Sequence, residues 1–255
     1  MNDEPILDLG TEEYYEDRLS NCCHEVIYFH TDICSYCGNH TTFKKKTMKV
    51  LELFAGSRSF SKVAEEMGME TFCVDIKPFD NIDYVTDILD FDISKVPFKP
   101  DIIWASPPCT YFSVASIGHH WNKDHTPKTK EAVLGCQIVV QTLRIIDKLQ
   151  PDFYFIENPR GKLRKLEFMK PIPRATVTYC QYGDTRMKPT DIWTNHLYAP
   201  LFATGWNPKP ICKNGDPCHT SAPRGSTTGT QGLKGNYLRS IVPYELCKEI
   251  LKSTL

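Results

Sequence analysis

Apolar residues occur along the chain in two patterns, short continuous runs and longer stretches with helical periodicity. The continuous runs lie at 49–54, 72–74, 101–103 and 153–156. Most of them end in glycine, proline or acidic residues, which is typical of buried strands. Residues 57–67 and 129–150 repeat apolar positions at helical spacing and predict amphipathic helices. Strands that alternate with helices predict an α/β fold with a parallel sheet.

Four further elements complete the predicted order. They are the end of a third strand at 86–88, a strand at 175–183 that ends in a turn, a final strand at 191–195 and a closing helix at 245–251. Five residues of the helix at 129–150 are predicted to face the sheet: Val133, Ile138, Leu143, Ile146 and Leu149.

The pattern also divides the chain into three predicted parts. Residues 1–45 combine an acidic beginning with a cysteine-rich module, and residues 46–199 contain the alternating strands and helices. Residues 200–255 are rich in Gly, Pro, Ser and Thr before the closing helix. This last part predicts ordered irregular structure or a loop shaped by a partner.

The composition narrows the class of protein. The 255 residues are 41% hydrophobic and 24% charged, as in soluble globular proteins, and no apolar run approaches the length of a membrane helix. Without a signal-peptide pattern at the N-terminus, a cytoplasmic location is expected. Eleven cysteines in a reducing compartment favour a metal site or a nucleophile over disulfides. A net charge of −1 predicts no general attraction to nucleic acid.

Cys109 is the strongest candidate for a nucleophile. It follows the strand at 101–103 through Pro107-Pro108, which stop the strand and hold the next residues at its carboxyl end. Ligands bind at that edge of an open parallel sheet. The alternative is a buried cysteine that only fills space, as most free cysteines do.

A glycine turn follows the first strand. Gly56 lies between that strand and the helix at 57–67, and Asp75 ends the next strand 19 residues later. An acid about 20 residues after such a turn commonly binds ribose hydroxyls. Asp87, at the end of the third strand, is placed to meet an adenine amino group, or it caps a turn or helix.

Two cysteine pairs near the N-terminus predict a zinc site. Cys34 and Cys37 form a C-x-x-C pair followed by glycine, and Cys22 and Cys23 supply two further thiols for tetrahedral zinc. His24 or His40 is an alternative to one of the second pair, and unrelated or redox-active thiols are the other interpretation.

Three motifs in this order resemble the DNA (cytosine-5)-methyltransferase family, in the form of a compact phage or bacterial member. They are Leu53-Phe54-Ala55-Gly56, Ser106-Pro107-Pro108-Cys109 and Glu157-Asn158-Pro159. The resemblance implies a Rossmann-like sheet that binds S-adenosyl-L-methionine over residues 46–199 and a small target-recognition or closing segment over 200–255. It implies cofactor contacts for Phe54, Gly56, Asp75, Asp87 and Ser106.

The same resemblance implies a covalent mechanism on DNA. Cys109 would add to carbon 6 of cytosine, and Glu157 would read the ring nitrogen and protonate it during the attack. Arg186 is the candidate for the base-contacting arginine of a Gln-x-Arg-x-Arg motif, although Gln181 stands further from it than the motif requires. The chain also lacks the motif Gly-Asn-Ser-Val-Pro-Pro and a large target-recognition domain. A monomer is favoured.

Three further groups have open roles. Residues 111–128, with Trp121, predict a loop that closes over a flipped base, or a solvated loop. The basic run 160–165 predicts phosphate contacts. Cys212, Cys218 and His219 are a weaker candidate for a second metal site, because their spacing is loose.

Two alternatives to the DNA enzyme follow from the sequence. An RNA cytosine methyltransferase keeps the fold, but the Ser-Pro-Pro-Cys turn resembles the DNA enzymes more closely. A zinc-containing nucleic-acid-binding protein on a decayed methyltransferase frame would explain why residues 56–59 do not form a G-x-G loop.

Overall fold

The computed structural model describes residues 23, 33–34, 36–39, 46–114, 116–201, 203–220, 233 and 235–255. The chain divides into two units, Met1–Thr47 and Met48–Leu255, and the central sheet belongs to the second. The predicted boundary at 45/46 lies two residues before this division, and residues 200–255 belong to the same unit as the sheet, where helix Tyr244–Ser253 packs against helix Ser59–Glu66.

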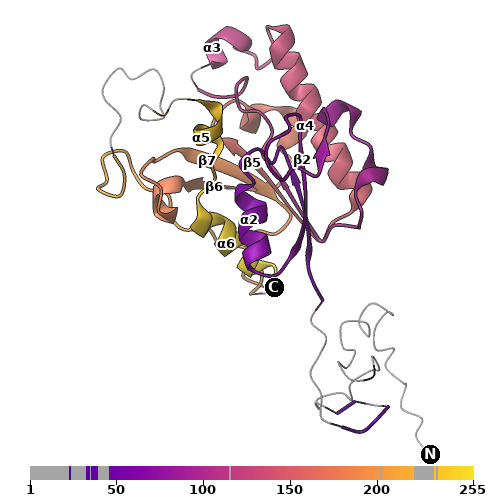
Figure 1. Cartoon of the computed structure of the whole chain (residues 1–255). Helices are drawn as coiled ribbons and strands as arrows, with labels where there is room; N and C mark the ends of the chain where they lie inside the picture. The colour runs from indigo at the N-terminus through magenta and orange to yellow at the C-terminus, as the bar shows by residue number, and fades with distance from the viewer. Residues whose placement is uncertain are drawn as a thin grey trace, which may run out of the picture. The chain divides into compact units, whose positions relative to one another are not determined.

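The second unit is built around a seven-stranded sheet with the strand order β3-β2-β1-β4-β5-β7-β6 (Figure 1). The strands are β1 (Lys49–Leu53), β2 (Glu70–Asp75), β3 (Tyr84–Val85), β4 (Ile102–Ala105), β5 (Phe153–Pro159), β6 (Arg174–Thr178) and β7 (Pro189–Thr194). The pairs from β3 to β5 are all parallel, whereas β7 runs antiparallel to both β5 and β6. The mixed α/β fold predicted from the sequence is confirmed.

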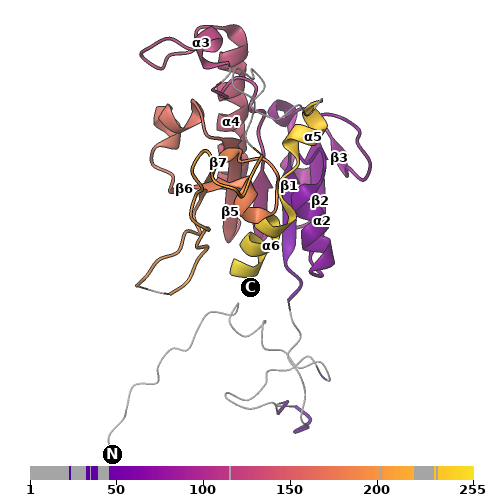
Figure 2. The same ribbon diagram turned by 90° about the vertical axis from the view of Figure 1, so that its left-hand side faces the viewer.

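Helices cover the sheet. They are α2 (Ser59–Glu66), α3 (Ile117–His120), α4 (Lys130–Leu149), α5 (Asn236–Ser240) and α6 (Tyr244–Ser253). Short 3-10 turns are η1 (Ile88–Asp90), η2 (Ile93–Lys95), η3 (Leu163–Lys165), η4 (Glu167–Met169) and η5 (Tyr179–Tyr182). α2 lies beside α6 in both views, and α3 lies near the start of α4 (Figure 2).

The two faces of the sheet carry separate cores. On β4, Ile102 and Trp104 point to the core that contains the buried residues of α2 and α6. Ile103 and Ala105 point to the other core, which contains the buried face of α4. Alternate residues of a strand point to opposite faces, so a strand covered on both sides reads as a continuous apolar run.

Helix α4 matches the predicted helix at 129–150 closely, but its buried face is rotated. The Thr129 side chain accepts a hydrogen bond from the Ala132 N–H at 3.2 Å and caps its beginning. The fully buried positions include Ala132 and Val139, whereas Val133 is 43% exposed. The prediction that Val133 faces the sheet was wrong, because the buried stripe of α4 runs through Ala132, Val139 and Ile146.

Two predicted strands are shorter than expected. The strand at 175–183 ends at Thr178, and the next four residues form η5, which Gly183 ends with a φ of 85°. The third strand is only Tyr84–Val85. Asp87 then caps η1, since its side chain accepts from the Leu89 N–H at 3.0 Å. This is the helix-cap role that the sequence had left open.

Candidate active site

The ends of β4 and β5 place the two main catalytic candidates at one edge of the sheet. The two strands pair in parallel with Ala105 opposite Ile156, so both end at the same edge. Cys109 follows β4 after the Pro107-Pro108 turn, and Glu157 directly follows Ile156 in β5. This edge is where parallel sheets bind ligands.

A buried hydrogen bond ties the two strand ends together. The Asn158 side chain is fully buried and donates from Nδ2 to the carbonyl oxygen of Pro107 at 2.9 Å. The bond fixes the turn that carries Cys109 against the strand that carries Glu157. Among the residues that the structure describes, Asn158 Oδ1 is buried without a hydrogen-bond partner. A buried amide rarely leaves an acceptor unused, so this oxygen is available to a bound molecule.

Glu157 is buried, with a cation and a hydroxyl beside its carboxylate. The Tyr179 hydroxyl donates to Glu157 Oε1 at 2.9 Å, and Lys188 Nζ lies 3.8 Å from the same oxygen. Lys188 Nζ also lies 4.4 Å from the centre of the Tyr179 ring. Burial and the charge of Glu157 hold the pKa of Tyr179 well above its usual range. Tyr179 therefore remains a hydrogen-bond donor.

Charges on both sides act on the Cys109 thiol. Burial raises the pKa of Cys109, the negative charge of Glu157 raises it further, and the positive charge of Lys188 lowers it. The thiol is therefore protonated at neutral pH in the absence of substrate. A thiolate forms there only when the balance of these charges changes.

The chain after Cys109 is held against the residues that follow β5. The Lys162 N–H donates to the Phe112 carbonyl oxygen at 2.7 Å. A Cβ at Gly161 would collide with that oxygen, so glycine permits the approach. Trp121 is 5% exposed, and its Nε1 donates to the Tyr111 carbonyl oxygen at 2.6 Å. Trp121 is therefore a core residue of this loop and not a side chain that projects into a duplex.

Arg186 is buried against the C-terminal segment. Its Nε donates to both carboxylate oxygens of Asp184 at 2.9 Å. Its terminal nitrogens donate to the carbonyl oxygens of Leu238, Arg239 and Ile241 at 3.3–3.5 Å. Arg186 therefore holds residues 238–241 in place, and Lys188 is the cation beside Glu157.

The predicted glycine turn is present and tight. The Gly56 N–H donates to Asp75 Oδ2 at 3.0 Å, which joins the ends of β1 and β2. Phe54, Gly56 and Arg58 have φ values of 59°, 44° and 54°. Ser106, at the end of β4, donates its N–H to the Leu53 carbonyl oxygen at 3.3 Å, so it borders the same turn. Four of the five predicted cofactor residues therefore lie around one turn.

Arg58 explains how the turn forms without a second glycine. It adopts the left-handed conformation that a G-x-G loop gives to glycine. Its guanidinium is turned back onto α2 and β2, where it pairs with Glu65 and donates from Nε to Cys73 Sγ at 3.3 Å. The departure from G-x-G thus changes the side chain and keeps the backbone shape.

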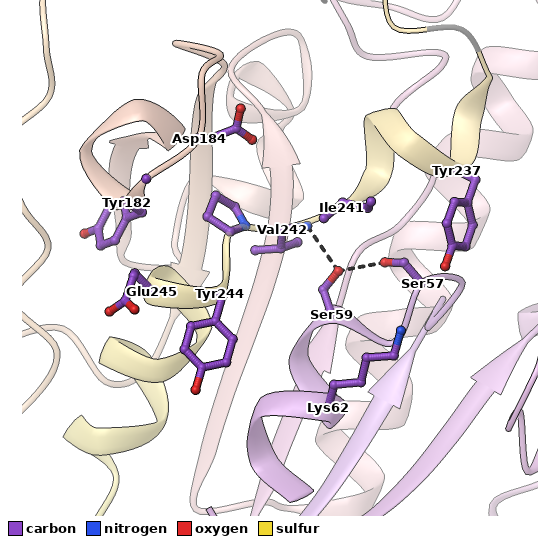
Figure 3. Close-up of a pocket in the computed structure, with 12 residues that line it drawn as sticks. Ser57, Ser59, Lys62, Tyr182, Asp184, Tyr237, Ile241, Val242, Tyr244 and Glu245 are labelled. Atoms are coloured by element: carbon purple, nitrogen blue, oxygen red, sulfur yellow. Dashed lines mark hydrogen bonds between the residues drawn. The ribbon is translucent and has the colours of Figure 1, made fainter. Parts of the chain in front are cut away.

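A cavity of about 490 Å³ opens beside this turn (Figure 3). Its wall is formed by Ser57 and Ser59 on one side and by the 241–245 segment on the other. The Val242 N–H donates to Ser59 Oγ at 3.2 Å and joins the two sides. None of the five cofactor residues predicted from the sequence lines the described wall of this cavity. The first residue of its lining is Ser57, which directly follows Gly56.

The basic run 160–165 is split between the surface and the interior. Arg160 and Lys165 are exposed, whereas the Lys162 ammonium lies 2.6 Å from His125 Nδ1. Arg164 pairs with the buried carboxylate of Asp191. A groove of about 320 Å³ runs between this segment and the loop after Cys109, and its lining contains all four basic residues of the run.

The N-terminal unit brings three predicted zinc ligands together. The thiols of Cys23, Cys34 and Cys37 lie within 4.8 Å of one another. Gly38, with a φ of 69°, donates its N–H to the Cys34 carbonyl oxygen at 2.9 Å, as expected for a turn around a metal. Cys22, His24 and His40 lie outside the described residues.

Comparison with known proteins gives the family. The model of the C-5 cytosine-specific DNA methylases matches residues 31–167, more than half of the chain. A protein of Frog virus 3 (isolate Goorha) named "Probable DNA (cytosine-5)-methyltransferase" is 31% identical over 219 residues, 80% of this chain and 99% of that protein. The chain belongs to the C-5 cytosine-specific DNA methylase family. The resemblance drawn from the three motifs is confirmed.

Two solved structures resemble part of this chain. The Entamoeba histolytica methyltransferase EhMeth is 15% identical with a TM-score of 0.45, over 59% of this chain and 53% of that chain. A mutant of Spodoptera frugiperda DNMT2 is 18% identical with a TM-score of 0.42, over 60% and 52%. The chain spans about half the length of these solved proteins.

Sequence reasoning missed two features of this methylase site. Lys188 stands at the last basic position of the family's Gln-x-Arg-x-Arg motif if Arg186 takes the first, and this spacing could have identified it. Gly235-Asn236 and Val242-Pro243 match parts of the sequence Gly-Asn-Ser-Val-Pro-Pro, with residues 237–241 between them. In the described part of the chain, no helix has the length and apolar character needed to cross a membrane.

Proposed function

We propose that this methylase transfers a methyl group from S-adenosyl-L-methionine to carbon 5 of cytosine in DNA, through a covalent bond to Cys109. The observation that carries the proposal is the sheet edge at which Cys109 and Glu157 meet, joined by the hydrogen bond from Asn158 to Pro107. The family assignment supports cytosine methylation, and the name of the viral relative supports DNA as the substrate.

The chemistry needs a nucleophile and an acid at this edge. Carbon 5 of cytosine is a weak nucleophile, and addition of the Cys109 sulfur to carbon 6 makes it enamine-like. As the sulfur–carbon bond forms, electrons move toward ring nitrogen 3, where Glu157 supplies a proton. Lys188 then stabilises the carboxylate that remains.

Glu157 and Cys109 are coupled in this proposal. The charge of Glu157 raises the pKa of Cys109, so a proton on Glu157 removes an obstacle to the thiolate. In the proposed step the proton of the Cys109 thiol passes to Glu157, which gives a thiolate beside an uncharged carboxyl group, and the charge of Lys188 lowers the pKa of the thiol. Both forms are the ones that the attack requires.

The residues present fit the cofactor. S-adenosyl-L-methionine supplies an electrophilic methyl group when it is bound. The cavity beside the glycine turn is lined by Lys62, Asp184 and Glu245, whose opposite charges suit the carboxylate and ammonium of a methionine group. Phe54, Gly56, Asp75, Asp87 and Ser106 are the proposed contacts of the remainder. After methyl transfer, carbon 5 loses its proton to solvent, the sulfur–carbon bond breaks with its electrons on Cys109, and ring nitrogen 3 returns its proton to Glu157, which restores the aromatic ring.

Two other groups complete the proposal. The groove lined by Arg160 and Lys165 supports contact with the phosphates of the nucleic acid. The thiols of Cys23, Cys34 and Cys37, with Cys22 as the predicted fourth ligand, support a structural zinc ion in the N-terminal unit.

Covalent trapping tests the proposed function. A duplex that contains 5-fluorocytosine cannot lose its carbon 5 substituent, so with S-adenosyl-L-methionine it should form a stable adduct with the protein. Cys109→Ser should abolish the adduct, whereas Cys136→Ser, a half-buried thiol of α4, should leave it unchanged. A parallel reaction with a 5-fluorocytosine tRNA transcript tests the RNA alternative. An adduct that persists in Cys109→Ser, or none across many duplex sequences, contradicts the proposal.

A further inference from the structure

Four metal-ligating side chains meet outside the active site. They are Cys180, Cys212, Cys218 and His219, and their ligand atoms all lie within 4.8 Å of one another. Cys180 belongs to η5, directly after Tyr179, and the other three come from residues 207–220, which contain neither helix nor strand. The sequence suggested only the last three, because Cys180 is 32 residues from Cys212.

The spacing of the four ligand atoms suits tetrahedral zinc. Cys180 Sγ lies 3.1 Å from Cys212 Sγ and 3.6 Å from Cys218 Sγ. His219 Nδ1 lies 3.7 Å from Cys212 Sγ and 3.5 Å from Cys218 Sγ. Zinc with Zn–S bonds of about 2.3 Å separates its ligand atoms by roughly 3.5–3.8 Å. Of these four separations three already match, and the Cys180–Cys212 pair must open slightly.

The surroundings distinguish this cluster from scattered surface thiols. Cys180 and Cys212 are buried, whereas Cys218 is exposed and gives a metal a route of entry. His219 Nε2 is buried without a hydrogen-bond partner among the described residues. A disulfide between Cys180 and Cys212 would use two of the four groups and leave the convergence of the others unexplained.

The loop that carries three of the ligands is also joined to residues 178–185 by backbone hydrogen bonds. The Cys212 N–H donates to Thr178 Oγ1 at 3.1 Å, the Lys209 N–H to the Tyr182 hydroxyl at 2.9 Å, and the Thr220 N–H to the Thr185 carbonyl oxygen at 3.0 Å. A segment without its own helix or strand gains much of its order from a bound metal.

We propose that Cys180, Cys212, Cys218 and His219 bind one structural zinc ion. Binding forms three Zn–S bonds and one Zn–N bond, releases the protons of the thiols and involves no change of oxidation state. The ion joins the 207–220 loop to η5. Because Cys180 follows Tyr179, which donates to Glu157, the ion also stiffens one wall of the active site.

Metal content of the full-length protein tests this site. The variant Cys34→Ser/Cys37→Ser removes the N-terminal pair, so that any remaining zinc reports on the second cluster. We expect one zinc ion per chain by elemental mass spectrometry. Adding Cys212→Ser and Cys218→Ser should reduce it to none, and adding Cys136→Ser instead should leave one. Zinc that persists after Cys212 and Cys218 are both replaced overturns the proposal.

A cobalt spectrum keeps the test decisive if the cysteine variants fail to fold. Co²⁺ bound by the Cys34→Ser/Cys37→Ser protein should show thiolate charge-transfer bands and the visible bands of a tetrahedral site. His219→Cys in that background should keep one metal per chain and intensify the charge-transfer bands, because a fourth thiolate replaces imidazole. A folded background protein that takes up neither zinc nor cobalt overturns the proposal. These readouts do not depend on methyl transfer.

Discussion

Two buried glutamates in the same sheet have different surroundings. Glu52 lies in β1 and is 3% exposed, and Glu157 lies in β5 and is 5% exposed. The carboxylate of Glu52 accepts hydrogen bonds from the backbone N–H groups of Ser61 at 2.8 Å and Phe60 at 3.4 Å, at the start of α2. The carboxylate of Glu157 instead meets the side chains of Tyr179 and Lys188.

The difference shows that burial alone does not mark a functional acid. Burial raises the pKa of Glu52 to about 7, although the hydrogen bonds at the start of α2 oppose the shift. Its partners are backbone groups of a helix whose N-cap residue, Arg58, makes no side-chain cap, so the role of Glu52 is structural. Glu157 stands at the edge where parallel sheets bind ligands, and its partners are the side chains of Tyr179 and Lys188.

The largest expected effect comes from Glu157→Gln. Methyl transfer should fall by roughly 10³-fold, because the proposed proton donor to the ring is lost. In the free protein, alkylation of Cys109 by iodoacetamide should become faster, since the charge that raises the pKa of Cys109 is gone. The Cys109→Ser variant gives the background alkylation of the other thiols. Slower alkylation of Cys109 in Glu157→Gln would contradict this account.

Lys188→Met should lower methyl transfer by roughly 10²-fold, because the cation beside Glu157 is removed. It should also slow alkylation of Cys109, since the charge of Lys188 lowers the pKa of that thiol. Lys188→Arg keeps the charge and is the matched control. The two site variants thus share a loss of activity and differ in the direction of the alkylation change, which mere misfolding would not produce.

Glu52→Gln should change how the free energy of unfolding depends on pH. A carboxyl group whose pKa rises from 4.5 to about 7 on folding binds its proton more tightly in the folded state. Its contribution to the free energy of unfolding is present below pH 4.5 and falls by roughly 3 kcal/mol as the pH rises to about 7. Glu52→Gln should remove this slope in urea unfolding measured between pH 4.5 and 8. An unchanged slope would contradict the raised pKa of Glu52.

The smallest expected effect concerns Arg58 at the start of α2. Arg58→Gly relieves the left-handed backbone but loses the ion pair with Glu65, so the free energy of unfolding should change by less than about 1 kcal/mol. Arg58→Ala loses the ion pair and keeps the backbone cost, so it should be less stable than Arg58→Gly by about 1 kcal/mol. Equal stability of the two variants would show that the turn carries no such cost.

Much of the fold was predictable from local patterns. The apolar runs of β1, β4 and β5 and the long helix α4 were placed within a few residues, because burial on both faces leaves a continuous apolar run. The antiparallel direction of β7 was not predictable, since strand direction depends on pairing across the sheet. The end of β6 at Thr178 was missed because Tyr179 and Tyr182 are strand-forming residues that the fold turns into η5.

The sequence by itself pointed to Cys109 and Glu157, because each follows a local apolar run and proline follows the first of these runs. The second strand continues past Glu157 to Pro159. Only the tertiary structure decided which groups face Cys109 and Glu157. Lys188, which directly precedes β7, lies beside Glu157, and Arg186 donates hydrogen bonds to residues 238–241. Cys180 lies beside the thiols of a loop that is distant in the sequence. The interaction of charges and the coordination of a metal depend on distances in space. Distances along the chain do not fix those distances.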